Sequence, residues 1–129
     1  MNDAWIDRIG GLASVTCAVH CGIFSFAPAL VAVLGIEALA HEGFEWGFFA
    51  TAISFALLAA GWGYRTHGSI RVVAGFVLGA LLLSAARLGE AFELFEGGAV
   101  LAVCGGFILL GGHVANTLEL RSCREECCP

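Results

Sequence analysis

The sequence contains no lysine, and only 13% of its 129 residues are charged. Soluble globular domains carry about 25% charged residues, so this chain lies outside their range. Its six arginines are outnumbered by 11 acidic residues, and the formal net charge is −5. A chain without a basic face is not expected to bind nucleic acid. The two absences together exclude a soluble nucleic-acid-binding domain.

Features of secreted and energy-coupled proteins are also missing. The first eight residues have no basic n-region, so we expect no cleavable signal peptide. The chain has no ATP-binding motif, no soluble domain and no internal repeat, and we expect no buried acidic proton relay. An ATP-driven or proton-driven pump is therefore not expected.

The chain is rich in hydrophobic residues and contains long apolar segments. Hydrophobic residues make up 59% of it, and its mean hydropathy is +0.88. A membrane-spanning helix needs about 20 apolar residues, and four segments meet this requirement: 9–36, 46–64, 69–89 and 97–118. We expect an all-α membrane protein, a single four-helix bundle over residues 1–129 with a short cysteine-bearing tail at 119–129. Its first partner is then the lipid bilayer.

The charges between these segments predict an orientation. One side of the predicted bundle carries Arg8, Arg65, Arg71, Arg121 and Arg124. The other side is an acidic rim with a single arginine, Arg87. The positive-inside rule then predicts that both termini are cytoplasmic. Because Arg71 and Arg87 lie near the ends of the third segment, we expect both to extend toward the membrane interfaces.

Glycines are placed for close helix packing. Gly75 and Gly79 form a G-x-x-x-G pair in the third segment, and two further glycine pairs lie in the fourth. Such residues let helix backbones approach closely where lipid supplies no hydrophobic drive. They favour a compact bundle or a homodimer.

The chemistry begins in the first segment, at "SVTCAVHCG" (residues 14–22). On a helix, Cys17, His20 and Cys21 share one face, because residues three and four apart are neighbours. Thiolates are soft ligands that select Cu(I) or Hg(II), and two thiolates neutralise a divalent cation. We expect His20 to be a third ligand or to accept a thiol proton. Cys104 is a possible third sulfur if the first and fourth helices are neighbours, and it otherwise packs as a small apolar side chain.

The remaining cysteines lie in the tail. Cys123, Cys127 and Cys128 repeat the four-residue thiol spacing next to Arg121 and Arg124, which favour thiolates. A cytoplasmic location keeps such thiols reduced, so we expect metal capture or thiol exchange and no disulfide framework. An ion would pass from the membrane site to this tail.

Two polar residues of the fourth segment share a face near its cytoplasmic end, His113 and Asn116. His113 is a possible metal ligand that could assist ion exit. Alternatively, both side chains hydrogen-bond across the bundle. His67 is expected in a loop and carries no separate signal.

The stretch "TCAVHCGIFSFAPAL" in a chain with four apolar segments and a cysteine-bearing tail resembles the MerC family of mercury-resistance membrane proteins. The resemblance implies inward transport of Hg(II) across the bacterial inner membrane. It implies that Cys17 and Cys21 are the first-helix mercury pair, and that Cys123 with Cys127 or Cys128 is the cytoplasmic pair. The best-known members have C-x-x-C in the first helix, whereas this chain has C-x-x-H-C.

These observations predict a non-enzymatic carrier of a soft metal ion, with Hg(II) as cargo and no permanent cofactor. Affinity would drive it, together with a cytoplasmic thiol or reductase that accepts the ion. Three alternatives remain. The protein could be a membrane thiol-disulfide oxidoreductase, a haem- or copper-binding protein that uses His20 and His113, or a structural subunit whose cysteines only pack.

Overall fold

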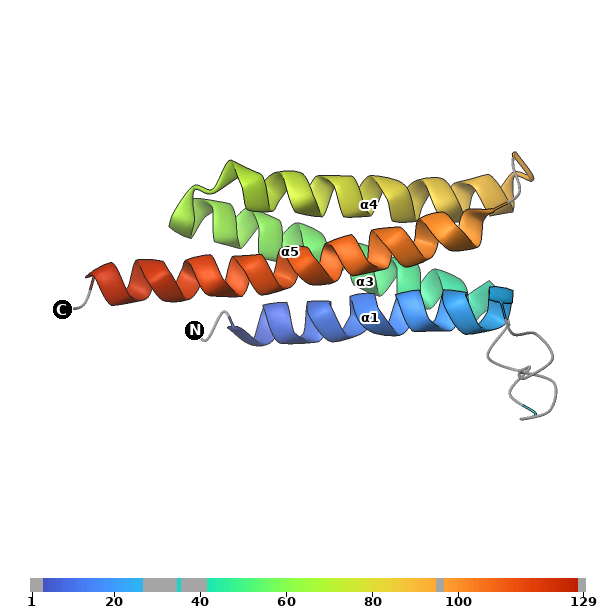
Figure 1. Cartoon of the computed structure of the whole chain (residues 1–129), viewed down its shortest axis with the longest axis horizontal. Coiled ribbons are helices and arrows are strands. Elements are labelled where there is room, and N and C mark those ends of the chain that lie inside the picture. The colour runs from blue at the N-terminus through green and yellow to red at the C-terminus, as the bar shows by residue number, and fades with distance from the viewer. Residues whose placement is uncertain (1–3, 27–34, 36–41, 95–96, 128–129) are drawn as a thin grey trace.

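The computed structural model describes residues 4–26, 35, 42–94 and 97–127, without the side chains of Ala4, Cys21, residues 24–26, Glu42 and residues 124–127. Within these ranges there are four helices: α1 (Ala4–Phe26), α3 (Glu42–His67), α4 (Ile70–Ala91) and α5 (Gly98–Cys127). They run alternately up and down (Figure 1). The start of α1 and the end of α5 therefore lie at the same end of the bundle, called here the terminal end.

Long apolar runs form the helices, and glycine conformations separate them. Gly68 has φ 66° and its N–H donates to the Tyr64 carbonyl at 2.9 Å, which ends α3. Gly97, directly before α5, has φ 100°. Both values lie in the left-handed region that glycine adopts at little cost. The α3–α4 connection is consequently only Gly68 and Ser69, so these two helices are antiparallel neighbours.

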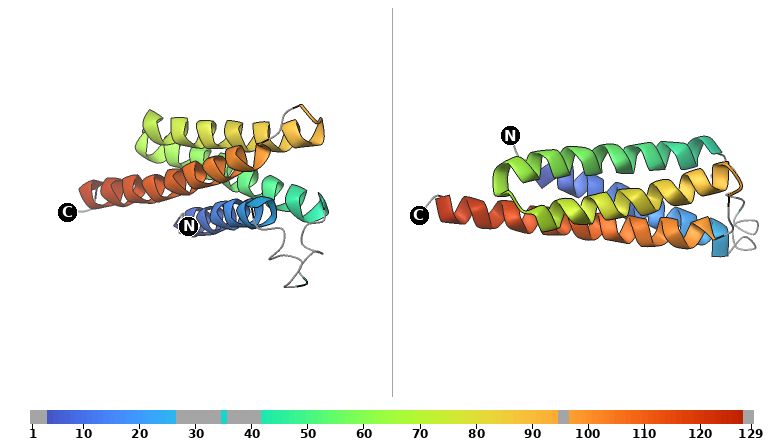
Figure 2. Two further views of the ribbon diagram at one scale, coloured as in Figure 1. Left: turned by 45° about the vertical axis from the view of Figure 1, so that its right-hand side comes forward. Right: turned by 90° about the horizontal axis from the view of Figure 1, so that it is seen from above.

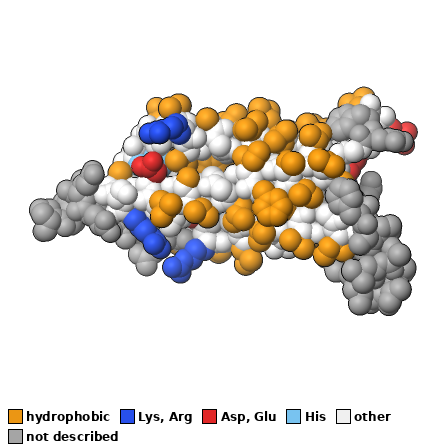
Figure 3. Space-filling model, viewed as in Figure 1, with side chains coloured by type: hydrophobic (Ala, Val, Ile, Leu, Met, Phe, Trp, Pro, Cys, Tyr) orange, Lys and Arg blue, Asp and Glu red, His pale blue; other side chains and the backbone are white. Residues whose placement is uncertain are grey.

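Within the described part of the chain, three helices are long and apolar enough to span a membrane: Gly43–His67, Ile70–Ala91 and Gly98–Cys123. Large hydrophobic side chains cover the visible face of the bundle along its length, and arginines gather toward the terminal end (Figure 3). This confirms the predicted all-α membrane fold. Which side of the membrane the terminal end faces stays a prediction.

The helix bounds differ from those expected at two places near the terminal end. α1 begins at Ala4, before the expected Ile9, and so includes Asp7. α5 continues to Cys127, well past the expected Leu118, so Cys123 and Cys127 lie in the last helix. Leu, Glu and Arg favour helix, and the chain can continue as a helix beyond the apolar run. Most of the expected first-helix residues 27–36 lie outside the described residues.

Glycines bring α5 between α1 and α4, as two views together show (Figures 1 and 2). A Cβ at Gly105 would lie 2.9 Å from the backbone N of Leu83 in α4. A Cβ at Gly106 would lie 2.7 Å from the Ala18 Cβ in α1. Gly79 of the expected G-x-x-x-G pair packs against Leu109, whereas Gly75 has nothing within 4 Å of its Cβ position. α5 thus contacts both neighbours at backbone distance.

Candidate metal site

One face of α1 is polar and points into the bundle. Asp7, Ser14, Cys17 and His20 are all buried, at successive spacings of seven, three and three residues. These spacings return to the same side of a helix. Ionisable residues inside a membrane bundle mark candidate functional sites. We call these four residues the α1 polar stripe.

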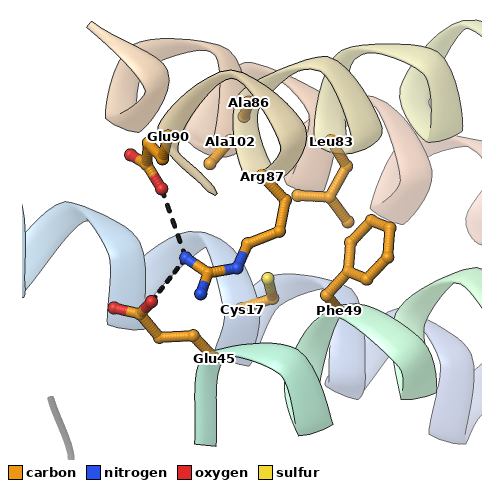
Figure 4. A pocket seen from close by; sticks show the side chains of 8 residues that line it. All are labelled: Cys17, Glu45, Phe49, Leu83, Ala86, Arg87, Glu90 and Ala102. Carbon is orange, nitrogen blue, oxygen red and sulfur yellow. Dashed lines mark hydrogen bonds and ion pairs between the residues drawn. The ribbon is translucent and has the colours of Figure 1, made fainter. Parts of the chain in front are cut away.

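Cys17, with 3% of its surface exposed, lines a cavity of about 50 Å³. All four helices contribute to this Cys17 cavity, which is lined by Cys17, Glu45, Phe49, Leu83, Ala86, Arg87, Glu90 and Ala102. Figure 4 shows the sulfur beside the guanidinium of Arg87. A polar cavity of this size can hold a few water-sized ligands. The sequence motif alone did not indicate that charged side chains surround Cys17.

Arg87 does not extend to the interface as expected. Its Nη1 is 2.5 Å from Glu45 Oε2 on α3 and 3.4 Å from Glu90 Oε2 on its own helix. The guanidinium carbon lies 4.9 Å from the Trp46 ring centroid, and only 11% of the side chain is exposed. Two carboxylates and an aromatic face compensate the charge inside the bundle, so the side chain turns inward.

The structure describes the side chain of His20 but not that of Cys21. His20 is buried, and its ring centroid is 5.1 Å from that of Phe48 on α3. It shares the α1 polar stripe with Cys17 but does not line the Cys17 cavity. Cys21 belongs to α1, and its side chain lies outside the described residues. Joint metal binding by the C-x-x-H-C residues therefore stays a prediction.

The other predicted ligands are spread along α5. Cys104 is exposed and does not line the Cys17 cavity, although α5 packs against α1. Cys123 is partly exposed near the end of α5, the side chain of Cys127 lies outside the described residues, and so does Cys128. With about 1.5 Å of rise per residue, Cys123 lies roughly 25–30 Å along the axis from the level of Cys17.

In the described part of the chain, no group of three or more His, Cys, Asp or Glu side chains is arranged to hold a metal ion. Cys104 and Cys123 form no disulfide within the described residues. A soft ion that binds two sulfurs in a line does not need such a cluster, so the Cys17 cavity remains the candidate site.

A second polar cluster lies near the terminal end, and it confirms the alternative that His113 and Asn116 hydrogen-bond across the bundle. Asp7 Oδ1 accepts a hydrogen bond from His113 Nδ1 at 3.0 Å. Asn116 Nδ2 donates to both Asp7 carboxylate oxygens, at 3.0 and 2.9 Å. His67 Nε2 is 2.8 Å from Asn116 Oδ1, and the backbone N–H of Ser69 donates to His67 Nδ1 at 2.9 Å. We call Asp7, His67, His113 and Asn116 the terminal network.

The hydrogen bonds of the terminal network determine which atom of each side chain donates and which accepts. Because Ser69 N–H occupies Nδ1 of His67, that ring donates from Nε2 to Asn116 Oδ1. The amide orients its NH₂ toward Asp7, and His113 donates from Nδ1. The His113 ring fits where α1 has Gly10: a Cβ there would lie 2.2 Å from its Cε1. The terminal network therefore ties α5 to both α1 and α3.

The structure differs from the expectations at this network in two ways. An acidic group is buried in the bundle, since Asp7 is 3% exposed, and this burial was not expected from the sequence. His67 is the last residue of α3 and lies in the network, not in a separate loop. The early start of α1 is the reason for the first difference, because it places Asp7 on the α1 polar stripe, and the extension of α3 to residue 67 is the reason for the second. The seven-residue spacing from Asp7 to Ser14 could have revealed the first.

Comparison with known proteins identifies a family. No curated protein and no solved structure matches the chain. The family model described as MerC mercury resistance protein matches residues 7–118. The match begins at the buried carboxylate of the α1 polar stripe and includes the Cys17 cavity, Arg87 and the terminal network. The chain belongs to the MerC mercury resistance family.

Proposed function

We propose that this protein binds Hg(II) and carries it inward across the bacterial inner membrane by thiolate exchange. The observation that carries the proposal is the buried sulfur of Cys17, which lines a charged cavity inside a helical membrane bundle. Membership of a mercury resistance family supports Hg(II) as the cargo. The protein acts as a carrier and not as an enzyme, and it needs no resident cofactor.

Charge balance explains why thiols suit this position. An uncompensated charge inside the membrane costs at least several kcal/mol. When Cys17 and Cys21 bind Hg(II), two Hg–S bonds form and two thiol protons leave, so the complex is neutral. His20, one position from Cys21, accepts a proton or becomes a third ligand. A hydrated, hard cation gains no such compensation from sulfur.

The charges of the Cys17 cavity support entry from the end opposite to the termini. Glu45 and Glu90 outnumber Arg87, so the three groups carry one net negative charge when ionised. A net negative charge at the cavity raises the local concentration of cations. The acidic rim expected from the sequence would extend this field.

Onward transfer uses the sulfurs at the terminal end of α5. Cys123, Cys127 and Cys128 compete for the ion with higher local thiol density than the membrane pair. With both termini in the cytoplasm, a cytosolic thiol or a reductase then removes Hg(II). Affinity and removal inside drive the transport, without ATP.

Cellular uptake tests the proposal. Cells that express wild-type protein, Cys17→Ser with Cys21→Ser, or Cys104→Ser are given radioactive Hg(II), and accumulation is measured at equal protein level. We expect the double variant to fall to the level of cells without the protein. Cys104→Ser is the matched control and keeps uptake, because its side chain is exposed on α5. Equal uptake by the double variant and wild type would remove the central claim.

Purified protein decides the identity of the ion. Competition among Hg(II), Cu(I) and Zn(II) for one binding equivalent is expected to leave Hg(II) bound, since two thiolates in a line favour it. Preferential retention of Cu(I) or Zn(II) would assign a different cargo to the same site.

A further inference from the structure

A cationic side chain faces the sulfur inside the Cys17 cavity. Carboxylates of Glu45 and Glu90 hold the guanidinium of Arg87 through Nη1 alone. Its Nε is buried and has no hydrogen-bond partner among the residues that the structure describes. Figure 4 shows Nη1 on the carboxylate side of the guanidinium and Nε on the side of Cys17. One donor of a buried cation is thus available to a ligand in the cavity.

We propose that Arg87 forms a halide site that receives the ligand leaving Hg(II) when Cys17 attacks the metal. The inference rests on the proposed function and names a site within it. In chloride solution Hg(II) is present as neutral HgCl₂, which enters an apolar bundle without the cost of a bare dication. Once sulfur binds, a chloride must leave inside the protein, where an unpaired anion is costly. The N–H donor and positive charge of Arg87 stabilise it there.

The step balances in atoms and charge. Cys17 S–H and HgCl₂ give Cys17 S–Hg–Cl, one proton and one chloride: an Hg–S bond forms, an S–H bond and an Hg–Cl bond break, and no oxidation state changes. Chloride goes to Arg87. The proton goes to Glu90, whose side chain is the more exposed of the two carboxylates, at 44% against 29% for Glu45. Adding one proton and one chloride leaves the net charge of the cluster unchanged.

The cavity and its surroundings fit this assignment. A volume of about 50 Å³ is large enough for one halide beside the metal. Glu45 and Trp46 hold the guanidinium in place from α3, so the donor is positioned before the metal arrives. Arg87 is a positioning residue for the leaving ligand, and it does not bind the metal.

The rate of mercury attachment to individual cysteines tests the halide site. Full-length purified protein, as wild type, Arg87→Gln, Arg87→Lys or Arg71→Gln, is mixed with Hg(II) from HgCl₂ or from mercury(II) perchlorate in chloride-free buffer. The reaction is stopped by alkylation, and peptide mass spectrometry reports the fraction of Cys17 and of Cys123 that carries mercury. Arg71→Gln is the matched control, because Arg71 is exposed on the same helix.

We expect Arg87→Gln to slow mercuration of Cys17 by HgCl₂ about tenfold or more, the effect of losing a hydrogen bond to a charged group. Cys123 in the same molecules should react at the wild-type rate. With mercury(II) perchlorate no halide leaves, so the difference at Cys17 should largely disappear. Arg87→Lys keeps the positive charge and should recover most of the lost rate.

Two results would overturn the halide site: an unchanged Cys17 rate in Arg87→Gln, or an equal loss with both mercury sources, which a purely structural role of Arg87 predicts. Failure of the proposed function would look different, because wild-type Cys17 would then take up no mercury from either source.

Discussion

Single residues decide how charge is accommodated inside this bundle. Arg87 has Glu45 within ion-pair distance on α3, so an inward rotamer replaces the extended one expected from its position near a helix end. Asp7 has the same relation to His113 and Asn116, which supply three hydrogen bonds to its carboxylate. In both cases the partner comes from a different helix, and the buried charge is stable only because that helix is present.

The terminal network leads to a prediction about stability. Asp7→Ala removes the acceptor of His113 Nδ1 and Asn116 Nδ2 and leaves two buried donors unsatisfied. We expect the free energy of unfolding in detergent to fall by about 2–4 kcal/mol, measured by denaturant titration followed by circular dichroism. Arg8→Gln, at the exposed neighbouring position, is the control and should change stability little. If Asp7→Ala and Arg8→Gln have the same free energy of unfolding, the hydrogen bonds of Asp7 do not contribute to stability.

At the scale of the helices, the pattern of α1 explains the location of the candidate site. The α1 polar stripe (Asp7, Ser14, Cys17 and His20) and Gly10 lie on the face of this otherwise apolar helix that points into the bundle. Gly10 leaves room for the His113 ring of α5, which packs against α1 between Asp7 and Ser14. The sulfur of Cys17 and the imidazole rings of His20 and His113 therefore lie on the same side of α1.

Close packing of α5 gives a second stability prediction. A Cβ at Gly106 would lie 2.7 Å from the Ala18 Cβ and 3.0 Å from the Ser14 carbonyl oxygen. Gly106→Ala should therefore destabilise the protein by about 1–3 kcal/mol through overpacking of α5 against α1.

Gly111→Ala on the same helix provides the matched comparison. Nothing lies within 4 Å of the Cβ position at Gly111, and alanine is the better helix former by up to about 1 kcal/mol. We expect equal or higher thermal stability for this variant. A Gly106→Ala protein as stable as Gly111→Ala would mean that α1 and α5 do not pack at backbone distance.

For the whole molecule, the up-and-down arrangement places the start of α1 and the end of α5 at the same end (Figure 1). Transport toward the cytoplasm requires this terminal end to face inward, so that Cys123 meets cytosolic thiols. The Cys17 cavity would then open toward the outer side through Glu45 and Glu90.

Thiol labelling in spheroplasts tests this orientation. A membrane-impermeant maleimide should label the tail cysteines only after the membrane is permeabilised. Leu94→Cys, made in a variant without native cysteines, places a thiol at an exposed position beyond α4, at the opposite end. It should react without permeabilisation. The reverse labelling pattern would invert the protein in the membrane and with it the direction of transport.

Local features of the sequence were enough to predict the fold class and Cys17 as a candidate. Apolar length and the lack of charge predict membrane helices, because a helix satisfies its backbone hydrogen bonds within one segment. The C-x-x-H-C spacing predicts that its three residues share one face. Both inferences depend on residues close together in the chain.

Tertiary structure alone decided which side chains surround these residues. Asp7 and His113 are 106 positions apart, and no spacing rule connects them. Arg87 reaches Glu45 only because α4 packs beside α3, and His67 joins the terminal network only because the end of α3 lies against α5. The compensation of a buried charge depends on which helices meet and at what height, and this is determined by packing across the bundle and not by any one segment.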